Sequence, residues 1–239
     1  MKVAIVGPGA LGCYLAARMI QKGIDTVLVD YKSDRIERLN RTGITLDLAG
    51  ETIQARPKCV SSVPASSSLV VICVKSNKSS VLQLDGTPEV LTLQGGLGNV
   101  ETLCSKVGSA NILAGSMSDA VVLGEEGHVS CTYPGLVRFG SWTSCSTANA
   151  EKAFTAAGLT VEITDAPGQA IWESVAIQSG IDPLTALLGV PNGRLVEIPT
   201  ARQLMRDLVV EAVKVASTEG YRFNRSLVEV AEERCIQTK

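Results

Sequence analysis

The sequence lacks the features that mark nucleic-acid-binding and membrane proteins. Lysine and arginine together number 22, against 24 aspartate and glutamate residues, and the formal net charge is −2. A nucleic-acid partner would favour a basic face, and this charge balance gives no sign of one. No stretch reaches the roughly 18 consecutive apolar residues that cross a bilayer. We therefore expect a protein that binds neither nucleic acid nor membrane.

Signals of export and of metal binding are also missing. Residues 1–7 (MKVAIVG) lead directly into an apolar run and lack the three regions of a signal peptide. The cysteines form no C-x-x-C pair and no metal-ligand spacing, and several lie inside apolar runs. They are Cys13, Cys59, Cys73, Cys104, Cys131, Cys145 and Cys235. This usage predicts free thiols, no metal site and a cytoplasmic location. The only histidine, His128, lies beside a glycine and is expected in an exposed loop.

What the sequence does contain is an alternation of short β-rich runs with helical patterns. Apolar residues make up 45% of the 239 residues, enough for a sizeable core. Strands are predicted at 3–6, 26–29, 44–48, 52–55, 69–74 and 90–93, and helices at 10–21 and 33–40. This rhythm predicts an α/β fold with a doubly wound, Rossmann-like parallel sheet.

The second half of the chain changes character twice. Residues 111–140 are short extended runs broken by glycine and proline, and we expect them to be antiparallel strands that close the sheet. After a further helix and strand, residues 165–168 (DAPG) mark a boundary, and the rest of the chain has helical spacing throughout. The predicted domains are therefore a Rossmann domain over 1–166 with an antiparallel extension, and an all-helical domain over 167–239.

A dinucleotide-binding fingerprint, G-x-G-x-x-G, lies between the first predicted strand and the first predicted helix, which is the context that gives it meaning. Its residues are Gly7, Pro8, Gly9, Ala10, Leu11 and Gly12. Gly7 allows the tight turn, Gly9 lets backbone N–H groups approach a pyrophosphate, and Gly12 lets the helix pack against the strand. The helix N-terminus then favours the phosphate charge.

The end of the second predicted strand bears on the choice of cofactor. Asp30 follows Gly12 by 18 residues, close to where a carboxylate accepts the adenosine ribose hydroxyls. Because a carboxylate there repels a 2′-phosphate, NAD(H) is slightly favoured over NADP(H). Lys32 and Arg35 stand nearby and offer charges that could bind a 2′-phosphate instead.

Several segments besides the fingerprint resemble one known family across nearly the whole chain. They are Val74-Lys75-Ser76, residues 93–99 (LQGGLGN), residues 171–173 (IWE) and residues 180–193 (GIDPLTALLGVPNG). Together they resemble the ketopantoate reductase family, which reduces 2-dehydropantoate to pantoate with NADPH. The resemblance implies a Rossmann domain followed by a helical domain, here C-terminally shortened.

The resemblance also shows where this sequence departs from the family pattern. Ser174 stands where the family has its proton-donating lysine. Gln178 and Asp182 replace two substrate-binding asparagines, and Gly95 replaces an asparagine that contacts nicotinamide and substrate. The family positions that remain are Lys75 and Val121 on the cofactor side and Asn192 on the substrate side.

These replacements have a chemical consequence. Hydride transfer to a ketone leaves negative charge on oxygen, which a lysine ammonium stabilises and protonates. Ser174 carries no charge, so the loss costs on the order of several kcal/mol of transition-state stabilisation. Asp182 would repel the substrate carboxylate. We therefore expect an oxidoreductase that acts on a small molecule other than ketopantoate, with Lys75, Ser174, Gln178 and Asp182 as candidate catalytic residues.

Two other functions stay open at this point. One is a non-redox enzyme of the isomerase or cyclase type that uses the old cleft. The other is a non-catalytic binding or regulatory protein. For the shortened helical part we expect exposed apolar surface at Leu208, Val209 and Val213, which self-association into a homodimer would cover. The oxidoreductase is preferred because its motif is present, whereas the alternatives rest on what is missing.

Overall fold

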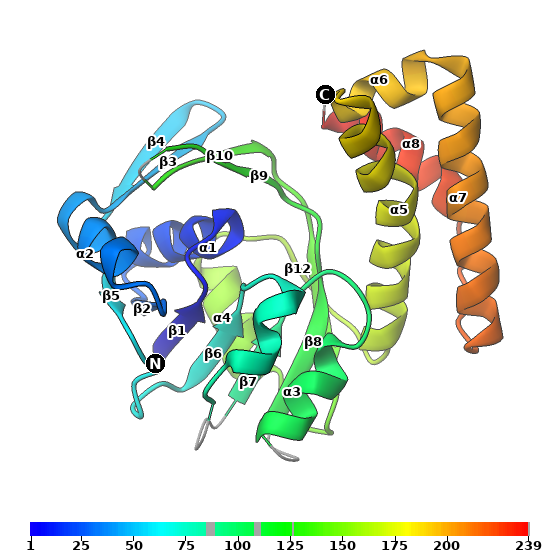
Figure 1. The fold of residues 1–239 in the computed structure, drawn as a ribbon. Helices are drawn as coiled ribbons and strands as arrows, with labels where there is room; N and C mark the ends of the chain where they lie inside the picture. The colour runs from blue at the N-terminus through cyan, green and yellow to red at the C-terminus, as the bar shows by residue number, and fades with distance from the viewer. Residues whose placement is uncertain (85–88, 108–110, 126, 239) are drawn as a thin grey trace. The chain divides into compact units, whose positions relative to one another are not determined.

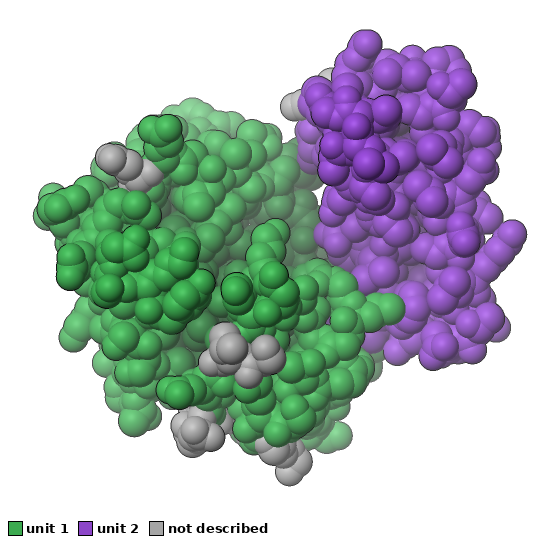
Figure 2. All heavy atoms as spheres, in the orientation of Figure 1, with its two compact units in different colours: residues 1–167 green, residues 168–239 purple. Residues whose placement is uncertain are grey.

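The computed structural model describes residues 1–84, 89–107, 111–125 and 127–238 (Figure 1). The chain forms two compact units, Met1–Pro167 and Gly168–Lys239 (Figure 2). The first combines helices with two β-sheets and the second is helical. This confirms the predicted α/β fold class with a helical C-terminal part.

Eight strands form the main sheet of the first unit, in the order β12-β11-β8-β7-β6-β1-β2-β5. The strands from β8 to β5 run parallel, β11 is antiparallel to β8, and β12 is parallel to β11. Their bounds are β1 (Lys2–Val6), β2 (Asp25–Val29), β5 (Lys58–Val60), β6 (Leu69–Ile72), β7 (Glu89–Thr92), β8 (Asn111–Met117), β11 (Val137–Ser141) and β12 (Val161–Ile163). Strands β6 and β7 are buried at every position, as continuous apolar runs predict for a central parallel strand.

The order of the strands fixes where a ligand would bind. From β1 the chain passes to β2 and β5 on one side, and then crosses to β6 on the other side of β1. Sheets of this type bind ligands in the crevice at the carboxyl ends of the strands, where the winding reverses. The helices of this unit are α1 (Ala10–Gln21), α2 (Ser33–Thr42), the 3-10 helix η1 (Ser76–Val81), α3 (Asn99–Val107) and α4 (Ala148–Ala156).

A second sheet corrects the prediction of a single antiparallel extension. Strands β4 (Glu51–Ala55), β3 (Ile44–Leu48), β10 (His128–Tyr133) and β9 (Ala120–Leu123) form a separate four-stranded sheet in that order. Strand β8 is parallel to β7, and β10 pairs in parallel with β3 of the predicted hairpin. The apolar face of this sheet, including Leu46, Ile53 and Val129, is buried in the core that also contains α1. His128 is exposed as expected, but it begins β10 and pairs with Asp47.

Helix α1 lies between the main sheet and this second sheet (Figure 1). Its sequence ALGCYLAARMIQ is apolar on most sides, which predicts burial all round. The Tyr14 hydroxyl is buried and donates to Asp119 Oδ1 at 2.9 Å. Burial and the neighbouring carboxylate raise the pKa of Tyr14, so the hydroxyl stays protonated. Packing on both sides holds α1, and therefore its N-terminus, in a fixed position.

The second unit is a helical bundle. It is built from α5 (Pro167–Leu188), α6 (Asn192–Glu197), α7 (Pro199–Thr218) and α8 (Leu227–Gln237). Its core brings together Ile177 and Ile181 of α5 with Met205 and Val209 of α7. Gly180 permits the close approach, because a Cβ there would lie 2.6 Å from Val209 Cγ2.

The prediction of an exposed apolar face at Leu208, Val209 and Val213 is wrong for Val209, which is fully buried. Leu208 and Val213 are half-buried and pack against the same core, so only part of the expected apolar surface is exposed. All seven cysteines are free thiols, as predicted. Among the described residues, no helix could cross a membrane and no cluster of His, Cys, Asp or Glu could hold a metal ion.

Candidate functional site

The glycine-rich turn after β1 is shaped by close contacts that only glycine permits. Gly7 has φ of 101°, and a Cβ there would lie 2.6 Å from Val74 Cγ1 and 2.8 Å from Val74 N. A Cβ on Gly12 would lie 2.1 Å from the Gly7 carbonyl oxygen. Both positions therefore require glycine for packing, as the fingerprint predicts. The Gly7 N–H donates to Val29 O at 2.9 Å, which ties the turn to β2.

Gly9 differs from its two neighbours in the motif. Its backbone, at φ −83° and ψ −166°, is accessible to any residue, and no described atom lies within 4 Å of the position of its Cβ. Gly9 is the N-cap of α1, yet the helix has no side-chain cap and no acidic residue in its first turn. The backbone N–H groups of the first turn, which include those of Ala10 and Leu11, therefore lie next to this open space. They form the positive end of the helix dipole. This arrangement fits a pyrophosphate.

A nearby thiol adds no negative charge to this site. Cys13 lies in the second turn of α1 and is buried. Burial raises the pKa of Cys13 to about 12, so the thiol stays neutral at physiological pH. The Cys13 N–H donates to Gly9 O at 2.9 Å, which secures the first turn of the helix.

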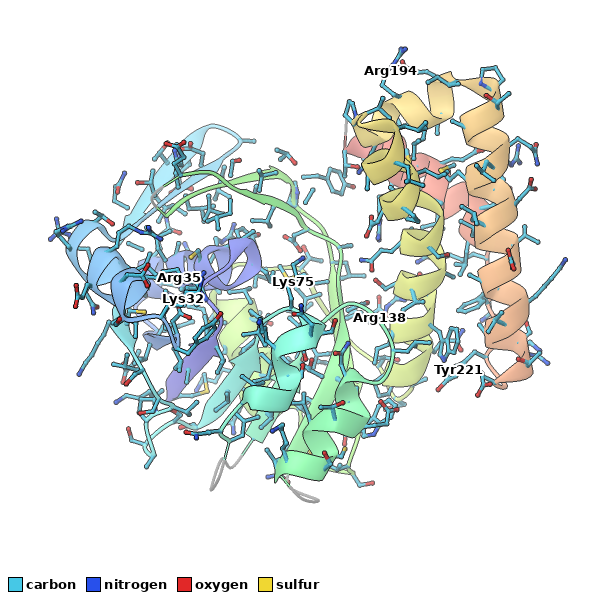
Figure 3. The ribbon with its side chains drawn as sticks, viewed as in Figure 1. Lys32, Arg35, Lys75, Arg138, Arg194 and Tyr221 are labelled. Carbon is cyan, nitrogen blue, oxygen red and sulfur yellow. The ribbon has the colours of Figure 1, made fainter. Side chains whose placement is uncertain are left out.

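Asp30, at the end of β2, does not present a free carboxylate. Arg35 donates from Nη2 to Asp30 Oδ1 at 2.8 Å and from Nε to Oδ2, and the Tyr31 N–H donates to Oδ1 at 2.8 Å. The Asp30 side chain is 1% exposed, against 28% for Arg35. This pairing raises the pKa of Arg35, whose guanidinium stays charged. The acceptor that the sequence suggested for the ribose hydroxyls is therefore already occupied. Lys32 is exposed beside it (Figure 3).

Lys75 lies in the turn after β6, at the same edge of the sheet as the glycine-rich turn. It is the N-cap of η1, and its side chain is exposed (Figure 3). Within the described part of the chain, no hydrogen bond or ion pair of its ammonium group is found. Lys75 is thus a cation held at the carboxyl edge and available to a ligand.

The glycine-rich segment after β7 forms the next turn along this edge. Gly95 is exposed, and Gly96 and Gly98 have φ of 92° and 81°. Asn99, the first residue of α3, donates from Nδ2 to the carbonyls of Gly95 at 3.0 Å and Gly96 at 3.2 Å. The turn is therefore anchored from within, although Gly95 itself brings no side chain to the site.

The remaining candidates are distributed over other elements. Ser174, Gln178 and Asp182 lie on α5 at i, i+4 and i+8, so they share one helix face as predicted. Asn192 begins α6, and its Nδ2 donates to Thr238 Oγ1 at 2.7 Å. Val121 lies on β9 of the second sheet and is half-buried against the core.

Comparison with known proteins identifies the family. The family model described as "Ketopantoate reductase PanE/ApbA" matches residues 3–144, and the model for the C-terminal part of the same family matches residues 168–239. The chain is 32% identical to a 2-dehydropantoate 2-reductase of Halobacterium salinarum over 250 residues, covering 100% of this chain and 82% of that protein. The chain belongs to the ketopantoate reductase family.

Solved structures share the fold of this chain. A PanE/ApbA family ketopantoate reductase from Ralstonia eutropha JMP134 is 28% identical, with a TM-score of 0.84, covering 100% of this chain and 81% of that one. A D-mandelate dehydrogenase in a ternary structure with NADH and anilino(oxo)acetate has a TM-score of 0.87 at 22% identity, covering 98% and 79%. The ketopantoate reductase family consists of NAD(P)-dependent oxidoreductases.

The structure also brings to this edge a residue that sequence reasoning missed. Gln94 precedes the Gly95 turn, is buried, and donates from Nε2 to Val74 O and to Ser79 Oγ, each at 2.8 Å. The only signal for Gln94 in the sequence was its place as a polar residue directly after an apolar run. Its partners could not be inferred from local sequence, because they lie 15 and 20 residues away.

Proposed function

We propose that this member of the ketopantoate reductase family is an NAD(P)H-dependent reductase of a small carbonyl compound other than ketopantoate. The observation that carries the proposal is the open space in front of Gly9, at the uncapped N-terminus of α1. Gly7 and Gly12 are explained by packing alone, whereas the opening at Gly9 has no structural use within the described residues. A dinucleotide pyrophosphate fits both the space and the charge.

Lys75 supplies the positive charge that such a reduction needs. A nicotinamide cofactor, when bound, would supply a hydride to the carbonyl carbon, which would leave negative charge on the carbonyl oxygen. We propose that the Lys75 ammonium stabilises and protonates this oxygen, because the family lysine is replaced by Ser174. In the second unit, Ser174, Gln178 and Asp182 share one face of α5 and stay candidate substrate-binding residues.

For the cofactor, the pairing of Asp30 argues against a strong preference for NAD(H). Its charge is paired with that of Arg35, and the partly exposed guanidinium and the exposed Lys32 add positive charge close to the end of β2, the part of such folds that receives the adenosine ribose. The slight preference for NAD(H) inferred from the sequence rested on a free Asp30 carboxylate. We propose instead that Lys32 and Arg35 accept the 2′-phosphate, so that NADPH binds at least as tightly as NADH.

Replacing Lys32 tests this choice. Lys32→Ala is expected to raise the Kd for NADPH by roughly five- to tenfold, the loss of one charge-assisted contact, and to leave the Kd for NADH within about twofold. The matched control is Lys22→Ala, which removes the same charge at the other end of α1. If Lys32→Ala raised the Kd values for NADPH and NADH equally, or raised neither, the result would count against the 2′-phosphate site.

The proposed function is tested first by cofactor binding. NADH and NADPH are titrated into the wild-type protein and followed by cofactor fluorescence. Oxidation of the bound cofactor is then measured with pyruvate, 2-oxoisovalerate, phenylglyoxylate, 2-dehydropantoate and a set of neutral ketones. We expect binding of NADPH and turnover of a compound other than 2-dehydropantoate. No binding of either cofactor at millimolar concentration would overturn the proposal and direct attention to non-redox ligands.

A further inference from the structure

The amide of Gln94 joins two of the turns that form the candidate site. Its side chain is 9% exposed, and Nε2 uses both of its hydrogens, one on Val74 O and one on Ser79 Oγ, at 2.8 Å each. The acceptor side is also occupied, because the Thr92 hydroxyl donates to Oε1 at 3.2 Å. A buried amide with all these contacts has one defined orientation.

The two groups that Gln94 holds stand on either side of Lys75. Val74 O belongs to the peptide bond between Val74 and Lys75, and Ser79 lies in η1, of which Lys75 is the N-cap. The Lys75 carbonyl in turn accepts the Lys78 N–H at 2.9 Å. The backbone of Lys75 is therefore fixed before and after the residue, although its side chain is exposed.

The same contacts reach the glycine-rich turn. Val74 N lies 2.8 Å, and Val74 Cγ1 2.6 Å, from the position a Cβ on Gly7 would take, so Val74 packs directly on Gly7. Gln94 thus holds the peptide that separates the pyrophosphate turn from Lys75. Any shift of Val74 O would move the Lys75 backbone while Gly7 stayed tied to β2.

We propose that Gln94 is a positioning residue that sets the Lys75 ammonium against the nicotinamide end of the bound cofactor. Gln94 would contact neither the cofactor nor the substrate. It would position Lys75 through its hydrogen bonds to Val74 and Ser79. The inference rests on the proposed function, since Lys75 needs an exact position only if a cofactor binds beside it. Loss of the amide should leave cofactor affinity largely intact and release Lys75 from its place.

The test measures the reactivity of Lys75 with trinitrobenzenesulfonate, followed by peptide mass spectrometry, with and without NADPH. In the wild-type protein we expect NADPH to slow modification of Lys75 about tenfold, because a cofactor contact excludes the reagent. Gln94→Met keeps the size of the side chain and removes both donors. It should reduce this protection to less than about twofold while changing the Kd for NADPH by less than about threefold.

A pH-dependent variant separates positioning from packing. Gln94→Glu can donate to Val74 O only when its carboxyl group is protonated, and burial favours the protonated form. Protection of Lys75 by NADPH, relative to wild type, should therefore recover as the pH is lowered through the pKa of this carboxyl. Gln94→Met should show no such recovery. Ser79→Ala, which removes one acceptor of the Gln94 amide, should lose part of the protection of Lys75 by NADPH. It replaces Gln94→Met in the test if that variant does not fold.

The control is Asn149→Leu, which removes the hydrogen bond from Asn149 Nδ2 to Glu89 Oε2 at the amino end of β7. It should leave the protection of Lys75 unchanged. If NADPH binds and protects Lys75 equally in wild type, Gln94→Met and Ser79→Ala, the role of Gln94 is refuted and the proposed function stands. If the wild-type protein binds neither NADPH nor NADH, the proposed function fails and this inference fails with it.

Discussion

Gly9→Asp is expected to abolish measurable NADPH binding without loss of folding stability. The carboxylate would occupy the open space in front of α1 and meet the pyrophosphate with a like charge. At about 4 Å such a repulsion is worth several kcal/mol at a protein surface, so the Kd should rise by on the order of 100-fold or more. The protein itself should tolerate the change, because no described atom lies within 4 Å of the new Cβ.

Thermal unfolding provides the second half of this prediction. Aspartate is a better N-cap than glycine by a few tenths of a kcal/mol, since its carboxylate accepts the first-turn N–H groups. The Tm of Gly9→Asp should therefore equal or slightly exceed that of wild type. The contrasting variant is Gly12→Ala, whose Cβ would lie 2.1 Å from Gly7 O and should cost about 1–3 kcal/mol or more of stability. Wild-type affinity for NADPH in Gly9→Asp would contradict the assignment of the cofactor site.

Most of the fold that positions this site was predictable from local sequence patterns. The apolar runs gave β1, β6 and β7, and helix α1 spans the residues 10–21 that were predicted for it. These elements are specified by continuous burial and by glycine punctuation, both of which are visible within a few residues. The short edge strand β5 and helix α3 had no counterpart among the predicted elements, because neither has a strong periodic signal.

Pairings between distant segments could not be predicted in the same way. Strand β10 alternates between buried and more exposed positions like any half-buried strand, and nothing within residues 111–140 shows that its second partner, besides β9, is β3. Helix α1 is apolar on both sides, so the side that faces away from the main sheet must also be buried. The second sheet packs on that side. That reason becomes visible only when the burial of α1 is considered together with the hairpin.

The roles of single side chains in the candidate site also could not be predicted from local sequence. Asp30, Lys32 and Arg35 could all be located from the sequence, yet their roles depend on which two of them pair. In the structure Arg35 donates two hydrogen bonds to the Asp30 carboxylate, which weakens the argument from a free carboxylate at this position. Gln94 was missed for a related reason, since a buried glutamine has meaning only through its partners.

The second large effect is expected at Lys75. Lys75→Met should lower kcat/KM by about 100- to 1,000-fold with the carbonyl compound that the wild-type protein reduces, because the developing oxyanion loses its stabilising charge. The Kd for NADPH should change by less than about threefold, since the proposed pyrophosphate contacts lie on α1. The Tm should not change, because the side chain is exposed.

The matched control for this prediction is Lys78→Met, three residues further along η1. Lys78 is also an exposed lysine, so its loss changes the net charge and the local field by the same amount. Steady-state oxidation of NADPH should distinguish a specific role of Lys75 from a general effect of positive charge at this edge. If both variants lost activity equally, the lysines would act by attracting an anionic ligand. If Lys75→Met kept wild-type turnover, the oxyanion would have to be stabilised by a group other than Lys75.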